Sequence, residues 1–122
     1  MQGEKLNKTA TESDDLVVVR IDQRGDAGHI AHVTINNPEK RNALGMAGKR
    51  AIANAFSSLS RDEKLRAVVL TGAGEKSFIA GADLAEMKDL SVEEAEEEHT
   101  LTHYACDSIR RCPVPVIARV NG

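Results

Sequence analysis

A segment in the middle of the chain joins an apolar strand, a glycine-containing loop and a run of small residues. Residues 67–71 (AVVLT) are typical of a buried strand, and residues 72–76 (GAGEK) follow as a loop. Residues 77–84 (SFIAGADL) then leave the backbone open to close approach by another molecule, and Asp83 stands where it can cap a short helix over 84–88. Unpaired N–H groups at such a helix start favour a developing negative charge. The alternative is a capped loop with no chemical role.

The rest of the chain alternates strand and helix patterns. Residues 16–22 and 30–36 are rich in β-branched residues and predict two strands of a hairpin. Apolar residues spaced i, i+3, i+4 and i+7 predict a helix over 46–59, which begins weakly because Gly45 occupies the cap position. This order of elements predicts an α/β fold. Residues 1–15 are polar and aperiodic, so we expect a flexible tail followed by one folded unit over 16–122.

Residues 92–111 are predicted to form a long helix. Ser91 and Glu94 have the spacing of a capping box, glutamates crowd the first turns, and arginines lie at the other end, as the helix dipole favours. The apolar stripe of this helix consists of Leu101, Ala105, Ile109 and Cys112. The glutamates spread over several faces, so we interpret them as a solvated helix start and predict no metal site.

Composition narrows the class of protein. The 122 residues carry a formal net charge of −3 and are 41% hydrophobic, with no apolar run long enough to span a bilayer. We therefore expect no nucleic-acid partner and no membrane partner, and a cytoplasmic location. Cys106 and Cys112 do not share a helical face, so we expect reduced, partly buried thiols instead of a disulfide. Spacing also excludes the dinucleotide-binding fingerprint, the P-loop and the GxSxG nucleophile elbow.

Four blocks together resemble the enoyl-CoA hydratase/isomerase (crotonase) family. They are residues 36–44 (NNPEKRNAL), 68–74 (VVLTGAG), 78–84 (FIAGADL) and 115–122 (PVIARVNG). The resemblance covers residues 16–122 and concerns the N-terminal part of the family only. It implies the N-terminal portion of a crotonase-like ββα spiral with an incomplete core, and a homo-trimer or hexamer in the full-length protein.

The resemblance also implies roles for individual residues. The backbone N–H of Ala82 matches one of the two donors of an oxyanion hole that binds the thioester oxygen of an acyl-CoA. Coenzyme A enters as part of the substrate, and no separate cofactor is implied. Many family members carry a basic residue two positions after the aspartate of this loop, where this chain has Ala85, so the resemblance does not carry that phosphate contact over. The substrate-binding positions are Lys40, Arg41, Ala43 and Leu44 along the CoA cleft, with Ala80 against the adenine and Gly81, Asp83 and Leu84 in the same loop.

The sequence leaves the reaction open. In the family, the second oxyanion donor and the acid/base carboxylates follow the Asn121-Gly122 block, so we expect a truncated chain that is inactive alone. An enoyl-CoA hydratase is the first interpretation; isomerisation, thioester hydrolysis or a non-catalytic CoA-binding or assembly module are the alternatives. His99 and His103 could supply a base in an unusual member, or have a surface or packing role, and His32 is expected on the outer face of its strand.

Overall fold

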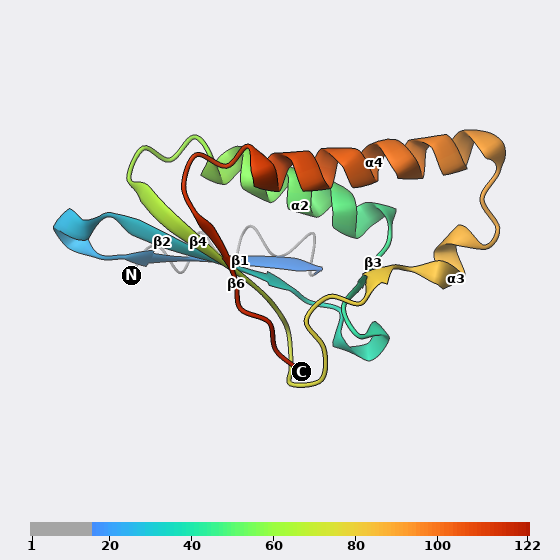
Figure 1. The fold of residues 1–122 in the computed structure, drawn as a ribbon, viewed down its shortest axis with the longest axis horizontal. Helices are drawn as coiled ribbons and strands as arrows, with labels where there is room; N and C mark the ends of the chain where they lie inside the picture. The colour runs from blue at the N-terminus through green and yellow to red at the C-terminus, as the bar shows by residue number, and fades with distance from the viewer. Residues whose placement is uncertain (1–15) are drawn as a thin grey trace.

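The computed structural model describes residues 16–122, so the tail predicted at 1–15 lies outside the described residues. The chain forms strands and helices in alternation (Figure 1). In chain order they are β1 Val17–Gln23, η1 Gly25–Ala27, β2 His29–Ile35, η2 Pro38–Lys40, β3 Ala43–Leu44, α2 Met46–Leu59, β4 Leu65–Gly72, β5 Gly81–Ala82, α3 Leu84–Met87, α4 Val92–Arg110 and β6 Val116–Ala118.

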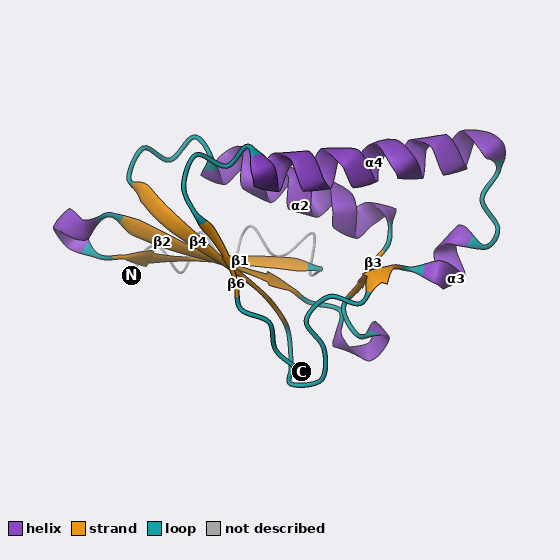
Figure 2. Cartoon of the chain, in the orientation of Figure 1, coloured by secondary structure: helices purple, strands orange, loops and turns teal. Residues whose placement is uncertain are grey.

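Four strands make the main sheet, in the order β1-β2-β4-β6. The β1–β2 pair is the predicted hairpin and is antiparallel, whereas β2–β4 and β4–β6 are parallel. Parallel neighbours require a crossover, and α2 supplies it between β2 and β4. Both long helices cover one face of this sheet, as Figure 2 shows. A second, two-stranded sheet pairs β3 with β5.

The predicted elements agree closely with the observed ones. The helix predicted over 46–59 is α2, and the one predicted over 92–111 is α4, which begins with the predicted Ser91–Glu94 capping box. The predicted strands differ from β1, β2 and β4 by one or two residues at their ends. The expected α/β class is therefore confirmed. The β3–β5 pair was not predicted.

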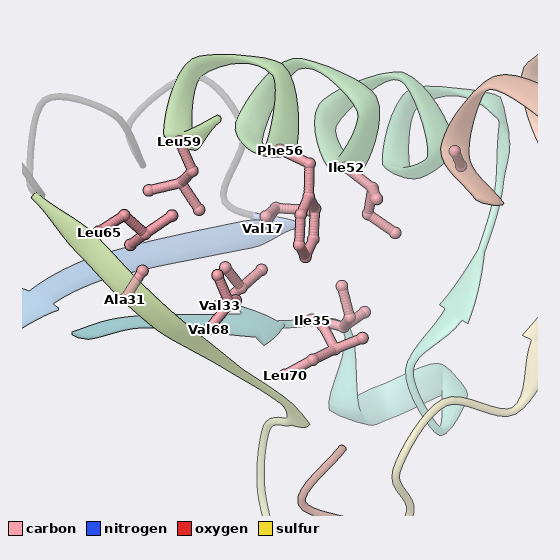
Figure 3. Packing of buried hydrophobic residues seen from close by; sticks show 11 residues of the cluster. Val17, Ala31, Val33, Ile35, Ile52, Phe56, Leu59, Leu65, Val68 and Leu70 are labelled. Atoms are coloured by element: carbon pink, nitrogen blue, oxygen red, sulfur yellow. The ribbon is translucent and has the colours of Figure 1, made fainter. Parts of the chain in front are cut away.

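The core lies between the sheet and α2 (Figure 3). Phe56 of α2 is fully buried above β-strand side chains that point to the same face. In β2, and at Val68 and Leu70 of β4, this follows because alternate residues of a strand share a face. Leu65 reaches the same face because the β2–β4 register shifts between Leu65 and Ala67. The strand side chains of this core are Val17, Ala31, Val33, Ile35, Leu65, Val68 and Leu70. The predicted apolar stripe of α4 joins them through Ala105, with Ile109 and Cys112 packed at the margin and Leu101 also buried.

One charged pair is buried between the two long helices. Lys49 of α2 is 5% exposed and its Nζ atom donates a hydrogen bond to Oε2 of Glu98 on α4, which is 8% exposed. The interpretation of every glutamate in α4 as solvated is therefore wrong for Glu98. The remaining glutamates of the helix, at 93, 94, 96 and 97, are exposed as expected.

The other sequence expectations concern single residues. Cys106 and Cys112 are both free thiols, as predicted, but Cys106 is exposed and not partly buried, because it lies outside the apolar stripe that buries Leu101 and Ala105. Within residues 16–122, no three metal-ligating side chains come close enough to hold an ion, and no helix there is long and apolar enough to cross a membrane.

Candidate functional site

A tight turn after β2 brings the first predicted block into a fixed shape. Pro38 begins the short helix η2, and Arg41 and Asn42 follow with left-handed backbone angles, φ 57° and 61°. Asn37 closes the turn, because its carbonyl accepts from Asn42 N–H at 2.8 Å and its side-chain amide donates to the Ala43 carbonyl at 3.1 Å. Asparagine tolerates the left-handed region better than most residues, which suits position 42.

The turn leads into β3, which pairs in parallel with β5 from the second predicted block. Ala43 lies opposite Gly81 and Leu44 opposite Ala82. Bonds beyond the ladder extend the pairing at both ends, with Ala80 N–H donating to the Arg41 carbonyl at 3.1 Å and Asp83 N–H to the Leu44 carbonyl at 3.0 Å. Two segments about forty residues apart in sequence are thus joined by backbone hydrogen bonds into one short parallel ladder.

Gly81 needs to be glycine because of its backbone and not because of crowding. Its φ is 115°, a region that L side chains rarely adopt, yet a Cβ built there would meet no atom within 4 Å. The space beside this residue is open. Another molecule can therefore approach the backbone of β5, as the small residues predicted.

A pocket of about 230 Å³ lies beside this ladder. It gathers four of the predicted substrate-binding residues, Lys40, Ala43, Leu44 and Asp83, around the start of α2. The rest of its lining comes from Leu16, Ile35, Asn37, Gly45, Ala47, Gly48 and Glu86. Its walls are mostly apolar, and the polar side chains among them are Asn37, Lys40, Asp83 and Glu86, a mixture that small-molecule sites generally have.

Asp83 is held ionised at the edge of this pocket. Its side chain caps α3, accepting from Ala85 N–H at 3.1 Å and Glu86 N–H at 3.3 Å, as the sequence predicted. Oδ2 also lies 3.3 Å from Nζ of Lys40. The bond from Glu86 N–H and then those from Lys40 and Ala85 outweigh partial desolvation and lower the pKa of Asp83. Lys40 itself is exposed, so its ammonium can exchange this partner for another anion.

Glu86 performs a capping role that the sequence analysis missed. Gly45 has no side chain to cap α2, and Glu86 Oε1 accepts from Met46 N–H at 2.7 Å instead. A Cβ at Gly45 would lie 2.8 Å from the Glu86 carboxylate, so the glycine makes room for this contact. The weak start of α2 is therefore compensated from α3. No local pattern signals it, because the two residues are forty positions apart.

We predict that Glu86→Ala lowers the free energy of unfolding by about 1 kcal/mol, because α2 loses the acceptor at its N-terminus. Adding Gly45→Ser in the same chain should recover most of that loss, since a serine at the cap position supplies its own acceptor. Urea denaturation of the two variants measures both effects. Gly45→Ser alone is the control and should not stabilise, because its side chain meets Glu86. A double variant no more stable than Glu86→Ala would contradict the capping role.

The structure does not bring every candidate residue to the pocket. The pocket lining does not include Arg41, Ala80, Gly81 and Leu84, which are exposed. It does not include Ala82 either, which is half-buried and pairs with the lining residue Leu44. His99 and His103 are exposed on α4, with their Nε2 atoms 3.2 Å apart, and are not among the lining residues. His32 lies on the sheet face away from the core, as expected, where partial burial and Arg20 lower its pKa.

Comparison with known proteins identifies the family of this chain. The family model for enoyl-CoA hydratase/isomerase matches residues 25–122. The chain belongs to the enoyl-CoA hydratase/isomerase family. The short-chain-enoyl-CoA hydratase of Clostridium acetobutylicum is 40% identical over 95 residues, covering 78% of this chain and 36% of that protein. The mitochondrial Delta(3,5)-Delta(2,4)-dienoyl-CoA isomerase of Homo sapiens is 39% identical over 105 residues, covering 77% and 32%.

Comparison with solved structures leads to the same family. A crystal structure of an enoyl-CoA hydratase/carnithine racemase from Magnetospirillum magneticum superposes with a TM-score of 0.79 at 37% identity, covering 88% of this chain and 39% of that one. An enoyl-CoA hydratase of Mycobacterium smegmatis gives 0.77 at 40% identity, covering 86% and 39%. The crotonase-like fold is confirmed for the part that this chain contains. The chain spans about a third of the length of the curated relatives it matches.

Proposed function

We propose that this chain forms the acyl-CoA-binding part of an enzyme of the enoyl-CoA hydratase type. The observation that carries the proposal is the parallel β3–β5 ladder, which places Ala82 opposite Leu44 beside a mostly apolar pocket. In this proposal the backbone N–H of Ala82 is one donor to the thioester oxygen. An acyl-CoA thioester is the substrate, and coenzyme A is part of it.

The polar groups of the pocket suit the CoA portion of such a substrate. The exposed Lys40 ammonium stands at the edge with Asp83 as its ion-pair partner among residues 16–122, and a CoA phosphate is a stronger anionic ligand for it. Open space beside the neighbouring Gly81 supports our assignment of Ala80 to the region that the adenine approaches, with Gly81 as a substrate-binding residue of the same loop. In this proposal Arg41, Ala43 and Leu44 follow the CoA cleft, and Asp83 and Leu84 belong to the loop that binds the substrate beside it.

The chemistry assigned to Ala82 is electrostatic. When water adds to the 2,3-double bond of an enoyl thioester, the thioester oxygen gains negative charge as the enolate forms. A main-chain N–H directed at that oxygen stabilises the transition state more than the ground state. The two pocket carboxylates have structural partners instead, because Asp83 caps α3 and Glu86 caps α2. We therefore assign neither of them to proton transfer. We also propose the trimeric or hexameric assembly and the cytoplasmic location that the resemblance and composition suggest.

The test is a binding and turnover assay of the protein at its natural length. Crotonyl-CoA is the reactive probe, and butyryl-CoA is the control that has no double bond to hydrate. We expect both to bind, and loss of enoyl absorbance with crotonyl-CoA only. Binding of both without turnover would favour a non-catalytic CoA-binding module. Binding of neither thioester would overturn the proposal.

A further inference from the structure

The loop that connects β4 to the candidate site is held by two asparagine side chains. Asn42 is fully buried, and its amide nitrogen donates to the carbonyls of Ala73 at 3.0 Å and Ser77 at 2.9 Å. Its amide oxygen accepts from Asn37 N–H at 2.8 Å. One side chain thus satisfies main-chain groups from the turn before β3 and from the loop after β4.

Asn121 binds the same loop from the other side. Its amide nitrogen donates to the carbonyls of Gly72 and Gly74, both at 2.9 Å. Its amide oxygen accepts from Gly72 N–H at 3.3 Å and from the Thr71 hydroxyl at 3.2 Å. Four carbonyls between positions 72 and 77 are therefore bonded by two side-chain amides, and we call these two residues the amide clamp.

Close packing leaves the clamped loop little freedom. A Cβ at Gly72 would lie 1.9 Å from the Phe78 carbonyl oxygen and 2.7 Å from the Asn42 amide nitrogen. Beyond the clamp, the Ser77 hydroxyl donates to the Arg41 carbonyl at 2.9 Å, the same carbonyl that accepts from Ala80 N–H. The path from Asn42 through Ser77 to β5 is thus a continuous series of hydrogen bonds that ends one residue before Gly81.

We propose that Asn42 is a positioning residue of the acyl-CoA site. Its amide fixes where β5 lies against β3 and thereby aims the Ala82 N–H at the thioester oxygen, with Asn121 holding the same loop. This inference rests on the proposed function of Ala82. It assigns no contact between Asn42 and substrate, because the side chain is buried behind the ladder.

Substitutions at position 42 separate the amide from the backbone shape. Asn42→Gly removes the amide but keeps the left-handed φ of 61° available. Asn42→Asp keeps an acceptor for Asn37 N–H but cannot donate to Ala73 and Ser77, and it sets a carboxylate against two carbonyl oxygens. Leu59→Ala, in the core at the far end of α2, is the control for a general loss of stability.

The measurement is the thioester carbonyl stretching frequency of bound butyryl-CoA in the protein at its natural length, followed by kcat with crotonyl-CoA. Wild type should lower that frequency relative to water. Both Asn42 variants should lose at least half of the lowering and about tenfold in kcat, while the Kd for CoA itself changes less than about threefold. Leu59→Ala should lower only the unfolding temperature.

The outcomes distinguish the two proposals. If wild type does not bind butyryl-CoA, the proposed function fails and the positioning role fails with it. If wild type binds and lowers the frequency, but Asn42→Gly does the same with unchanged kcat, only the positioning role is overturned. Should the position-42 variants be unfolded at the assay temperature, Asn121→Ala decides, because Asn121 is only partly buried. Like the Asn42 variants, Asn121→Ala should show a smaller lowering of the carbonyl frequency than wild type. A lowering equal to that of wild type would overturn the positioning role of the amide clamp.

Discussion

Replacing Glu98 with glutamine should lower the free energy of unfolding by about 3–5 kcal/mol. Lys49 would remain buried between α2 and α4 without the carboxylate that now accepts its hydrogen bond. The Thr102 hydroxyl, 3.4 Å from Glu98 Oε2, keeps its 3.0 Å hydrogen bond to the Glu98 carbonyl, so the cost arises at Lys49. Removing one member of a buried pair costs more than the pair itself contributes, since an uncompensated charge stays behind. Urea denaturation measures the loss.

The chain offers a matched control for this prediction. Arg50 and Glu97, the neighbouring residues on the same two helices, form an exposed pair 3.4 Å apart with side chains about half exposed. Glu97→Gln should cost no more than about 1 kcal/mol. The double variant Lys49→Met with Glu98→Leu should recover most of the stability lost in Glu98→Gln, because it leaves no buried charge. Equal costs for Glu97→Gln and Glu98→Gln would contradict the burial argument.

The Lys49–Glu98 pair should also make the folding stability depend on pH. The hydrogen bond from Lys49 lowers the pKa of Glu98 below its usual 4.5, despite the opposing effect of burial. A carboxyl with a lower pKa in the folded state contributes stability above its unfolded pKa and loses it as pH falls through the folded value. Unfolding temperatures should therefore drop below about pH 4.5, and Glu98→Gln should show a flatter profile there. Identical slopes in wild type and variant would rule out this contribution.

The helices were predictable because their signals are local. The i, i+4, i+7 spacing of Ile52, Phe56 and Leu59 and the Ser91–Glu94 box lie within single segments, and the structure shows both as predicted. The sequence also contains a signal from which the buried ion pair could have been predicted. Lys49 continues the stripe of α2 at three residues before Ile52, and Glu98 continues that of α4 at three residues before Leu101. Opposite charges that extend two facing apolar stripes predict that the helices pack with those charges together.

The site was predictable in composition but not in arrangement. The short motifs indicated which backbone would be open, and Gly81 and the Asp83 cap agree with that reading. The β3–β5 ladder has two residues on each side, too few for an alternating pattern, and its register depends on the turn at 37–42 and the loop at 72–77. Capping of α2 by Glu86 likewise depends on a tertiary contact. Such features follow from packing, which a local pattern does not encode.

Ala82→Pro should cause the largest loss of activity, about 100-fold to 1000-fold in kcat with crotonyl-CoA, if the proposed function is correct. Proline has no N–H, so the thioester oxygen would lose one of its donors while the side chain stays small. Ala82→Gly is the matched control because it keeps the N–H, and it should stay within about tenfold of wild type despite the added backbone freedom of glycine. Steady-state kinetics of the protein at its natural length, at a temperature where circular dichroism shows both variants folded, gives the comparison.

A role for the Ala82 side chain and a role for its main-chain N–H predict opposite orders of activity for the glycine and proline variants, so the pair distinguishes the two roles. A role for the alanine methyl group in packing would make the glycine variant the poorer enzyme and leave the proline variant partly active. Loss of the ladder opposite Leu44 would lower affinity for CoA as well as kcat, because the cleft residues Ala43 and Leu44 would move too. A missing oxyanion donor instead lowers kcat while the Kd for CoA is kept, since a contact made mainly in the transition state changes the rate and not ground-state binding. A proline variant that keeps kcat within tenfold of wild type would remove Ala82 from the catalytic machinery.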